Sequence, residues 1–287
     1  MRNGECGAPP VRAEPPVYDC AVPTERLNGI DIHFERSGTG PRLLFINGSG
    51  STLERAKPTI DMLRPHFDLT AHDQRGLGLT EVPTTPWTMA DHAGDAIALM
   101  DHLGWDTCRV WGISFGGMVA QELAVTVPAR IERLALLCTS AGGDGGASYP
   151  LHELAALPPS VRSETAARIM DTRFTPDWLA AHPGDRLIVE QLNAANLTEK
   201  TPQQLRGEHL QLEARRGHDV WERLHRISCP TLVAAGRYDG LAPVENSERI
   251  ASRITGSELR VYEGGHLFIA QDRRAFPELI EFLAAPA

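Results

Sequence analysis

The sequence predicts an α/β fold, in which helices flank a mostly parallel sheet of eight strands and a helical cap is inserted. Two observations predict this class. Short apolar, β-branched segments alternate with amphipathic helical segments over most of the chain, which is typical of βα units. Between residues 142 and 225 the alternation stops and only helical patterns follow. We therefore expect a core of residues 23–141 and 226–287 and a cap of residues 142–225, inserted after the sixth strand.

The first part of the core is predicted to hold six strands, each a short apolar or β-branched run. They are expected at residues 24–27, 31–35, 42–46, 68–72, 107–111 and 134–138. One helix is predicted at 53–63. Another begins after Thr88, where Asp91 completes a capping box, and ends before Gly104.

The rest of the chain predicts cap helices followed by two more strands. Helical patterns cover residues 163–170, 176–181, 185–192 and 202–215. Strands are expected at 230–236 and 258–262, with helices at 243–254 and 275–283. Residues 1–22 are rich in proline and lack the pattern of a signal peptide, so we expect a disordered tail there.

A serine between two glycines follows the fifth predicted strand. Ser114 lies between Gly112 and Gly116, and the apolar residues that follow have helical spacing. This is the pattern of a nucleophile elbow, a tight strand-to-helix turn that exposes a strained serine. Only glycine at the two flanking positions leaves room for the strand and helix to approach each other.

A serine nucleophile needs a histidine base and an acid that orients the histidine. On strand-turn-helix scaffolds these follow the serine in the order acid, histidine. Asp239 comes just after the strand at 230–236, and His266 follows the strand at 258–262 in a glycine-rich loop. We predict a catalytic triad of Ser114, Asp239 and His266, with Asp144, after the sixth strand, as the alternative acid.

With these residues the chain resembles the α/β-hydrolase superfamily, from about residue 25 to the end. The loop Asn47-Gly48-Ser49-Gly50 stands where the family usually carries His-Gly, and residues 73–80 resemble its Asp-x-Arg-Gly-x-Gly-x-Ser loop. The resemblance implies that the amides of Ser49 and Phe115 form the oxyanion hole, which must stabilise charge on the attacked oxygen. Asn47 departs from the family pattern and argues against the proline iminopeptidases. We expect its side chain to hold the loop through a local bond to the backbone.

Within the superfamily, the last third is most similar to 3-oxoadipate enol-lactonases and related small esterases. Residues 216–224 and 227–233 carry this resemblance. It implies a small or medium carboxylic ester or lactone as substrate, cleaved through an acyl-enzyme. Apolar residues near the nucleophile are expected to line the pocket: Phe115, Met118, Leu241, Leu267 and Phe268. An anionic lactone would require a cation from the cap, where the candidates are Arg162, Arg168, Arg173, Arg206, Arg215 and Arg216.

Other activities on this fold remain open at the level of sequence. Carbon–carbon bond hydrolases and cofactor-free haloperoxidases or perhydrolases use the same triad, although Leu267 follows His266 where the former usually carry tryptophan. A non-catalytic ligand receptor can also retain the triad residues. Turnover separates a receptor from an enzyme.

Composition sets limits on partners and location. The net charge of −9 and the pI near 5.7 argue against nucleic acid and acidic membranes as partners. No apolar run is long enough to span a membrane, and the five scattered cysteines fit a reducing compartment, so we expect a cytoplasmic protein. The spacing of Cys and His predicts no metal site, and the triad chemistry requires no cofactor. Whether the chain forms a homo-oligomer is left open.

Overall fold

The computed structural model describes residues 23–154, 157–196 and 199–286, so the predicted tail lies outside the described residues. An eight-stranded sheet has the order β1-β2-β4-β3-β5-β6-β7-β8. The first two pairings, β1 with β2 and β2 with β4, are antiparallel, and the others are parallel. The strands are β1 (Thr24–Leu27), β2 (Ile30–Ser37), β3 (Arg42–Ile46), β4 (Asp68–His72), β5 (Cys108–Ile113), β6 (Ile131–Leu137), β7 (Thr231–Gly236) and β8 (Glu258–Tyr262).

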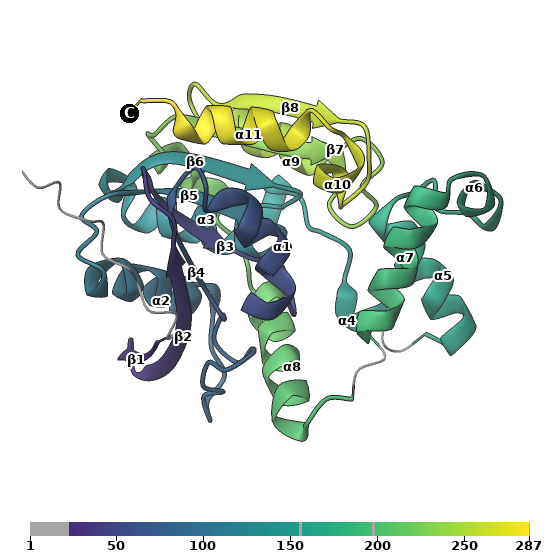
Figure 1. Cartoon of the computed structure of the whole chain (residues 1–287), viewed down its shortest axis with the longest axis horizontal. Helices are drawn as coiled ribbons and strands as arrows, with labels where there is room; N and C mark the ends of the chain where they lie inside the picture. Colours follow the sequence, from purple (N-terminus) through teal and green to yellow (C-terminus); the bar gives the residue numbers. More distant parts are fainter. Residues whose placement is uncertain (1–22, 155–156, 197–198, 287) are drawn as a thin grey trace, which may run out of the picture.

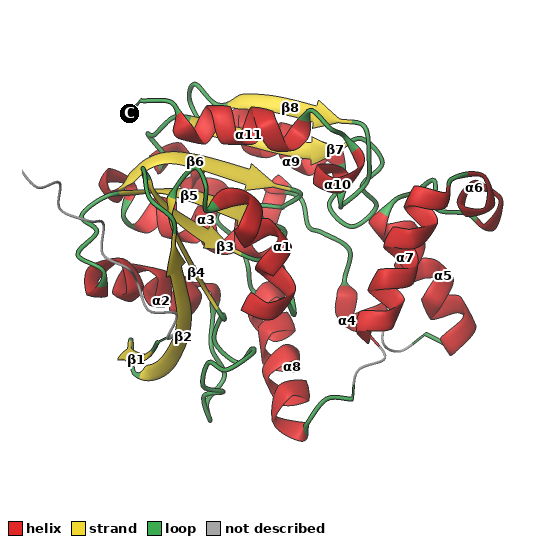
Figure 2. Cartoon of the chain, in the orientation of Figure 1, coloured by secondary structure: helices red, strands yellow, loops and turns green. Residues whose placement is uncertain are grey.

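Helices cover both faces of this sheet (Figure 2). Alternate residues of β3 point to opposite faces: Leu44 and Ile46 pack with α2, α3 and α9, whereas Leu43 and Phe45 pack with α1 and α11. The predicted architecture is therefore confirmed. These helices are α1 (Leu53–Leu63), α2 (Met89–His102), α3 (Phe115–Thr126), α9 (Val244–Arg253) and α11 (Ala275–Ala284).

Most element boundaries agree with the sequence patterns. Four strands and α1 have the predicted ends, and Thr88 and Asp91 form the predicted capping box of α2. Strand β6 begins earlier than predicted, at Ile131, because pairing with β5 extends it past the apolar run. The sequence patterns missed the short elements η1 (Pro128–Arg130), η2 (Gly143–Gly145), α4 (Leu151–Leu154), η3 (Trp221–Arg226) and α10 (Phe268–Gln271).

Helices occupy the chain between β6 and β7, as the sequence predicts. In Figure 1, α4, α5, α6 and α7 lie beside the sheet, while α8 runs along the core near α1. Gly207 of α8 packs directly on the carbonyl of Gly76. The limits of the cap as a separate domain stay a prediction. The helices are α5 (Pro159–Met170), α6 (Pro176–Ala181), α7 (Pro183–Asn196) and α8 (Pro202–Arg216).

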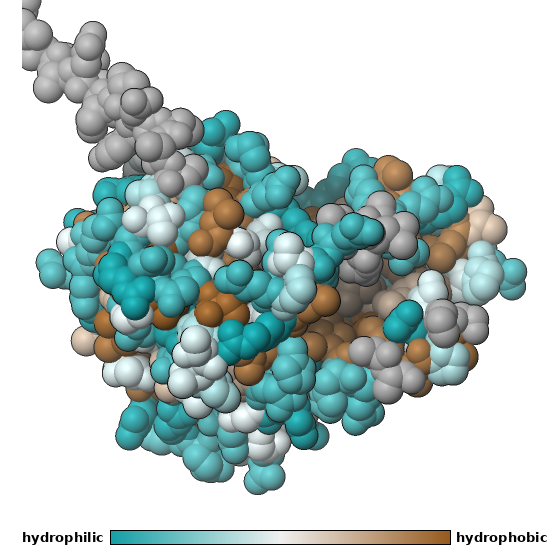
Figure 3. Space-filling model, turned by 90° about the horizontal axis from the view of Figure 1, so that it is seen from below, coloured by the Kyte–Doolittle hydropathy of each residue, from teal (hydrophilic) through white to brown (hydrophobic). Residues whose placement is uncertain are grey.

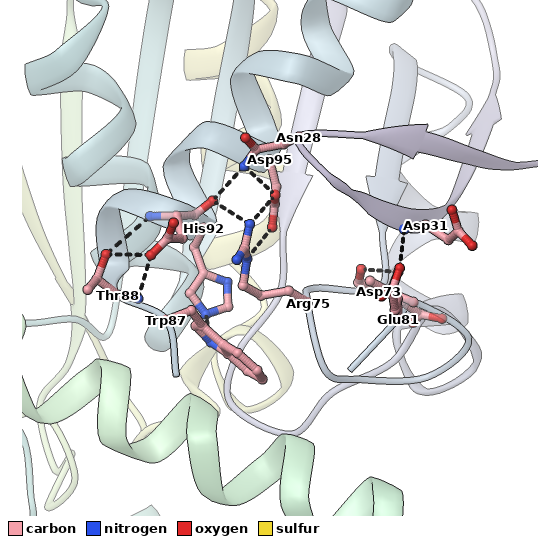
Figure 4. A network of polar contacts seen from close by, with 11 residues as sticks. Asn28, Asp31, Asp73, Arg75, Glu81, Trp87, Thr88, His92 and Asp95 are labelled. Atoms are coloured by element: carbon pink, nitrogen blue, oxygen red, sulfur yellow. Dashed lines mark hydrogen bonds and ion pairs between the residues drawn. The ribbon is translucent and has the colours of Figure 1, made fainter. Parts of the chain in front are cut away.

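A buried polar network fixes the loop that follows β4 (Figure 4). The Arg75 guanidinium donates to both carboxylate oxygens of Asp95, at 2.7 and 2.6 Å, and Asn28 donates to the same carboxylate. The Asp73 carboxylate accepts the amides of Leu53 and Leu79 at 2.7 and 2.9 Å, which ties the start of α1 to this loop.

Among the described residues, no helix combines the length and the apolar character needed to cross a membrane.

Candidate active site

Ser114 occupies the predicted elbow between β5 and α3. Its φ of 55° and ψ of −118° form a strained conformation for a residue with a side chain. A Cβ at Gly112 would lie 2.5 Å from the Gly116 carbonyl oxygen, and one at Gly116 would lie 2.1 Å from that of Ile46. The two glycines therefore allow the strand and helix to approach closely, as the sequence predicts.

The structure brings the three predicted triad side chains together. His266 Nε2 lies 3.0 Å from Ser114 Oγ, and His266 Nδ1 lies 2.8 Å from Asp239 Oδ2. All three residues follow the carboxyl ends of parallel strands, which lie along one edge of the sheet. Asp144 is exposed in η2, and among the described contacts its side chain has none with His266. Asp239 is thus the acid that faces the histidine.

Asp239 is buried and held by the backbone of its own loop. Its Oδ1 accepts the amides of Leu241 and Ala242, both at 2.8 Å, which leaves Oδ2 for His266. A carboxylate at this position accepts a hydrogen bond from Nδ1–H, which keeps the proton on Nδ1 and leaves Nε2 of the neutral ring as an acceptor. This is the tautomer that can take a proton from Ser114.

The loop after β3 runs beside the nucleophile. A Cβ at Gly48 would lie 3.5 Å from the Cβ of Ser114. Asn47 Oδ1 accepts the Gly48 amide at 2.9 Å, which is the local bond expected from the sequence. The Gln74 side chain also donates to the Asn47 carbonyl at 2.7 Å. Phe115 begins α3, so its amide has no acceptor within the helix and is available to a ligand.

Comparison with known proteins agrees with this geometry. Residues 41–272 match the family model described as alpha/beta hydrolase fold. The chain belongs to this family. The resemblance expected from the sequence is confirmed.

Two relatives of this α/β hydrolase are each 30% identical to it. A poly(3-hydroxyalkanoate) depolymerase from Ectopseudomonas oleovorans matches over 84% of the chain and 83% of its own length. 3-Oxoadipate enol-lactonase 2 from Acinetobacter baylyi matches over 84% and 87%. A solved hydrolase from Pseudomonas aeruginosa, 30% identical, superposes with a TM-score of 0.73 over 90% of the chain and 96% of its own.

The helices between β6 and β7 contact this site at two points that sequence reasoning missed. The first is Gln211 of α8, which is 1% exposed. Its Oε1 accepts the Gly50 amide at 2.8 Å, next to Ser49, while its Nε2 is buried without a partner among the described residues. A glutamine on a polar helix gives no signal of such a contact.

The second contact is made by the segment 170–172, at the end of α5. The His266 amide donates to the Met170 carbonyl at 2.6 Å, and the Thr172 amide donates to the Tyr238 carbonyl at 2.9 Å. The loops of the base and the acid are therefore bonded to the same three residues.

Gln271 links the buried carboxylate of this segment to the histidine loop. Its Nε2 donates to Asp171 at 3.0 Å, and its Oε1 accepts the Gly265 amide at 2.8 Å. Arg173 forks onto the same Asp171 carboxylate at 2.9 and 2.6 Å.

The residues that were predicted to line one pocket lie in different places in the structure. Met118 lines a cavity of about 350 Å³ near the end of β6. Leu241 is buried beside Asp239, and Leu267 is half-buried next to the histidine. Phe268 is fully buried in the core, where its ring stacks on Tyr262 with the centroids 5.1 Å apart. Phe268 thus lies on the inner side of α10 and points into the core, and this residue does not line the cavity.

Cys138 adds a possible metal ligand next to the triad, since its Sγ and donor atoms of Asp239 and His266 lie within 4.8 Å of one another. Burial, and secondarily the charge of Asp239, raise the pKa of this thiol well above its usual value. The thiolate is the form that binds metals. Its Sγ instead contacts the His266 carbonyl at 3.2 Å, and both ring nitrogens already face Asp239 and Ser114. These residues therefore do not fit a metal site.

Proposed function

We propose that the protein is a serine hydrolase that cleaves small or medium carboxylic esters or lactones. The observation that carries the proposal is the pair of hydrogen bonds that joins Ser114 Oγ to His266 at 3.0 Å and His266 to Asp239 at 2.8 Å. The enol-lactonase and the poly(3-hydroxyalkanoate) depolymerase among its relatives support ester-type bonds.

The proposed reaction begins when His266 Nε2 accepts the Ser114 proton and Oγ attacks the substrate carbonyl. The amides of Ser49 and Phe115 then donate to the oxyanion that forms. The tetrahedral intermediate collapses as His266 returns the proton to the leaving alkoxide, which leaves an acyl group on Ser114. His266 then takes a proton from water as the water attacks the acyl carbonyl, and returns it to Ser114 Oγ as the bond to the acyl group breaks and the acid leaves. Nucleophile, base and charge stabilisation all come from the chain, so no step requires a cofactor.

We also propose that the helices between β6 and β7 act as a cap that shapes the substrate pocket. The contacts of Gln211 with Gly50 and of Met170 with His266 support this role. Figure 3 shows a hollow between the body of the molecule and a smaller lobe, with apolar residues on its floor. Substitutions in residues 142–225 are expected to change acyl-chain preference more than reactivity toward a fluorophosphonate.

The first test uses the nucleophile. Wild-type protein should turn over p-nitrophenyl esters of short acyl chains or small lactones, with EDTA leaving the rate unchanged. Ser114→Ala should lower kcat at least about a thousandfold and abolish fluorophosphonate labelling. Labelling that persists at another serine, or one binding event without turnover, would contradict the proposal.

The second test compares two acids. Asp239→Asn should lower kcat by about ten-thousandfold, because the amide favours the wrong tautomer of His266. Asp144→Asn is the matched control and should retain wild-type kinetics, since Asp144 is exposed and away from the histidine. The reverse result would move the acid to the end of β6.

A further inference from the structure

Three consecutive amides of the loop after β3 differ in their hydrogen-bond partners. The Gly48 amide donates to Asn47 Oδ1 at 2.9 Å, and the Gly50 amide donates to Gln211 Oε1 at 2.8 Å. The Ser49 amide between them has no acceptor among the described residues, and it is the amide that the proposed reaction uses for the oxyanion. Side-chain acceptors therefore hold the amides on both sides of the one that must face the substrate.

Gly50 has few other contacts that could fix its backbone. Its φ is 64°, a conformation that glycine adopts freely, and a Cβ at this position would meet nothing within 4 Å. Its carbonyl oxygen accepts a long bond, of 3.5 Å, from the exposed side chain of Arg55. Among the described contacts of this glycine, the bond to Gln211 is therefore the short one that sets the orientation of the peptide group between Ser49 and Gly50.

Gln211 reaches this loop because α8 packs closely on the core. The buried residues of α8 are Gly207, Gln211 and Ala214, which lie on one face of the helix. A Cβ at Gly207 would lie 1.8 Å from the Gly76 carbonyl oxygen, so only glycine allows the helix backbone to come this near. Gln211 follows about one turn later on the same face, and its side chain connects the inserted helix to the loop of the oxyanion hole.

Only one of the two polar atoms of the Gln211 amide is satisfied. The Gly50 N–H can bond only to an acceptor, so Oε1 must face it and Nε2 must point the other way. Nε2 is buried and has no partner among the described residues. A buried donor without an acceptor destabilises the folded state, and a methionine of similar size would avoid that cost. Stability therefore does not explain an amide at this position, whereas the bond to Gly50 does.

We infer that Gln211 is a positioning residue for the oxyanion hole, because by accepting the Gly50 amide from α8 it holds the Ser49 amide where the oxyanion forms. The inference rests on the proposed function and adds that the hole is complete only while α8 is docked on the core. Acylation and deacylation both pass through an oxyanion, which forms only after the substrate has bound. Loss of the Gln211 acceptor should therefore lower kcat and leave KM nearly unchanged.

The test replaces Gln211 with methionine, which keeps the side-chain size and removes the acceptor. Gln211→Met should lower kcat for a p-nitrophenyl ester about 10- to 100-fold, with KM changed less than about threefold, since a small misplacement of a catalytic group is this costly. An alkyl trifluoromethyl ketone forms an adduct with Ser114 that places an oxyanion in the hole, so its inhibition constant should rise by the same factor as kcat falls. Gln203→Met, at an exposed position of the same helix, is the matched control and should behave as the wild type.

Three readouts separate positioning from a general structural role. The acid limb of the pH profile of kcat/KM reports the general base of the free enzyme, and its midpoint should be the same in Gln211→Met and wild type. Tm should change by less than about 5 °C, because removal of the unpaired donor offsets loss of the bond to Gly50. Gln211→Glu retains an acceptor oxygen in either protonation state and should turn over at least about fivefold faster than Gln211→Met.

The outcomes separate failure of this inference from failure of the proposed function. If the wild type turns over no ester and a fluorophosphonate does not label Ser114, the proposed function fails and the inference fails with it. If the wild type is active but Gln211→Met loses less than about tenfold in kcat, only the positioning role is overturned. The same holds if the pH profile shifts, if Tm falls by more than about 5 °C, if the ketone binds as tightly as before, or if Gln211→Glu brings no recovery. Should Gln211→Met not fold by circular dichroism, Gln211→Asn, whose shorter side chain withdraws the acceptor from Gly50, carries the same prediction.

Discussion

Gly207→Ala is a substitution for which helix propensity and packing predict opposite effects. Gly207 lies within α8, where alanine is favoured over glycine by about 1 kcal/mol. A Cβ at this position would lie 1.8 Å from the Gly76 carbonyl oxygen, whereas real contacts of this kind stay above 3.0 Å. The helix and the loop must therefore separate by more than an ångström, because neither backbone can rotate away.

The cost of overpacking should exceed the gain in helix propensity in Gly207→Ala. Overpacking costs about 2–3 kcal/mol, and the gain in helix propensity offsets about 1 kcal/mol of it. The net loss of about 1–2 kcal/mol in the free energy of unfolding should lower Tm by about 2–5 °C. The same shift draws Gln211 away from Gly50, which should lower kcat by about 10- to 100-fold, since misplacement of this size is costly in an active site.

Two assays check this prediction, thermal unfolding and turnover of a p-nitrophenyl ester. Gly184→Ala, near the start of α7, is the control: a Cβ there meets nothing within 4 Å, so its stability should rise by up to about 1 kcal/mol with unchanged activity. If Gly207→Ala were as stable and as active as the wild type, the direct packing of α8 on the Gly76 loop would be refuted.

Two further predictions concern stability. Arg75→Met should lower the free energy of unfolding by about 3–5 kcal/mol in urea denaturation, because it leaves the buried Asp95 carboxylate without its partner; a loss below about 1 kcal/mol would contradict this. Because burial lowers the pKa of His218 to about 4, acidification protonates this residue in the unfolded chain while it is still neutral in the folded chain. Stability contributed by this residue is present above the ordinary pKa of about 6.5 and is lost as pH falls from there to 4, by up to about 3 kcal/mol. His218→Gln should therefore show a shallower decline of unfolding free energy over that range, and equal slopes would exclude the effect.

The sequence predicted the elbow and the order of the triad because both depend on local rules. Glycines around Ser114 are required by the turn itself, and Asp239 and His266 each follow a recognisable strand, so the sheet topology brings them to the same edge. Phe268 shows the limit of such reasoning. Its place beside the histidine in sequence predicted a pocket wall, whereas the short helix α10 turns its ring into the core.

Contacts between distant segments could not be predicted in the same way. Gln211 meets Gly50 across 161 positions of sequence, and only the packing of α8 on the core brings them together.

The bonds made by residues 170–172 limit how this fold can be recombined. The segment 170–172 is hydrogen-bonded to both the loop of Asp239 and the loop of His266. A displacement of α5 therefore alters the alignment of acid and base before it alters the pocket. Because these bonds are made by backbone atoms, chimeras that import these helices from a relative must keep the backbone of residues 170–172 in register with the core. A chimera whose junction shifts the segment 170–172 out of register would lose turnover rather than acquire a new substrate preference.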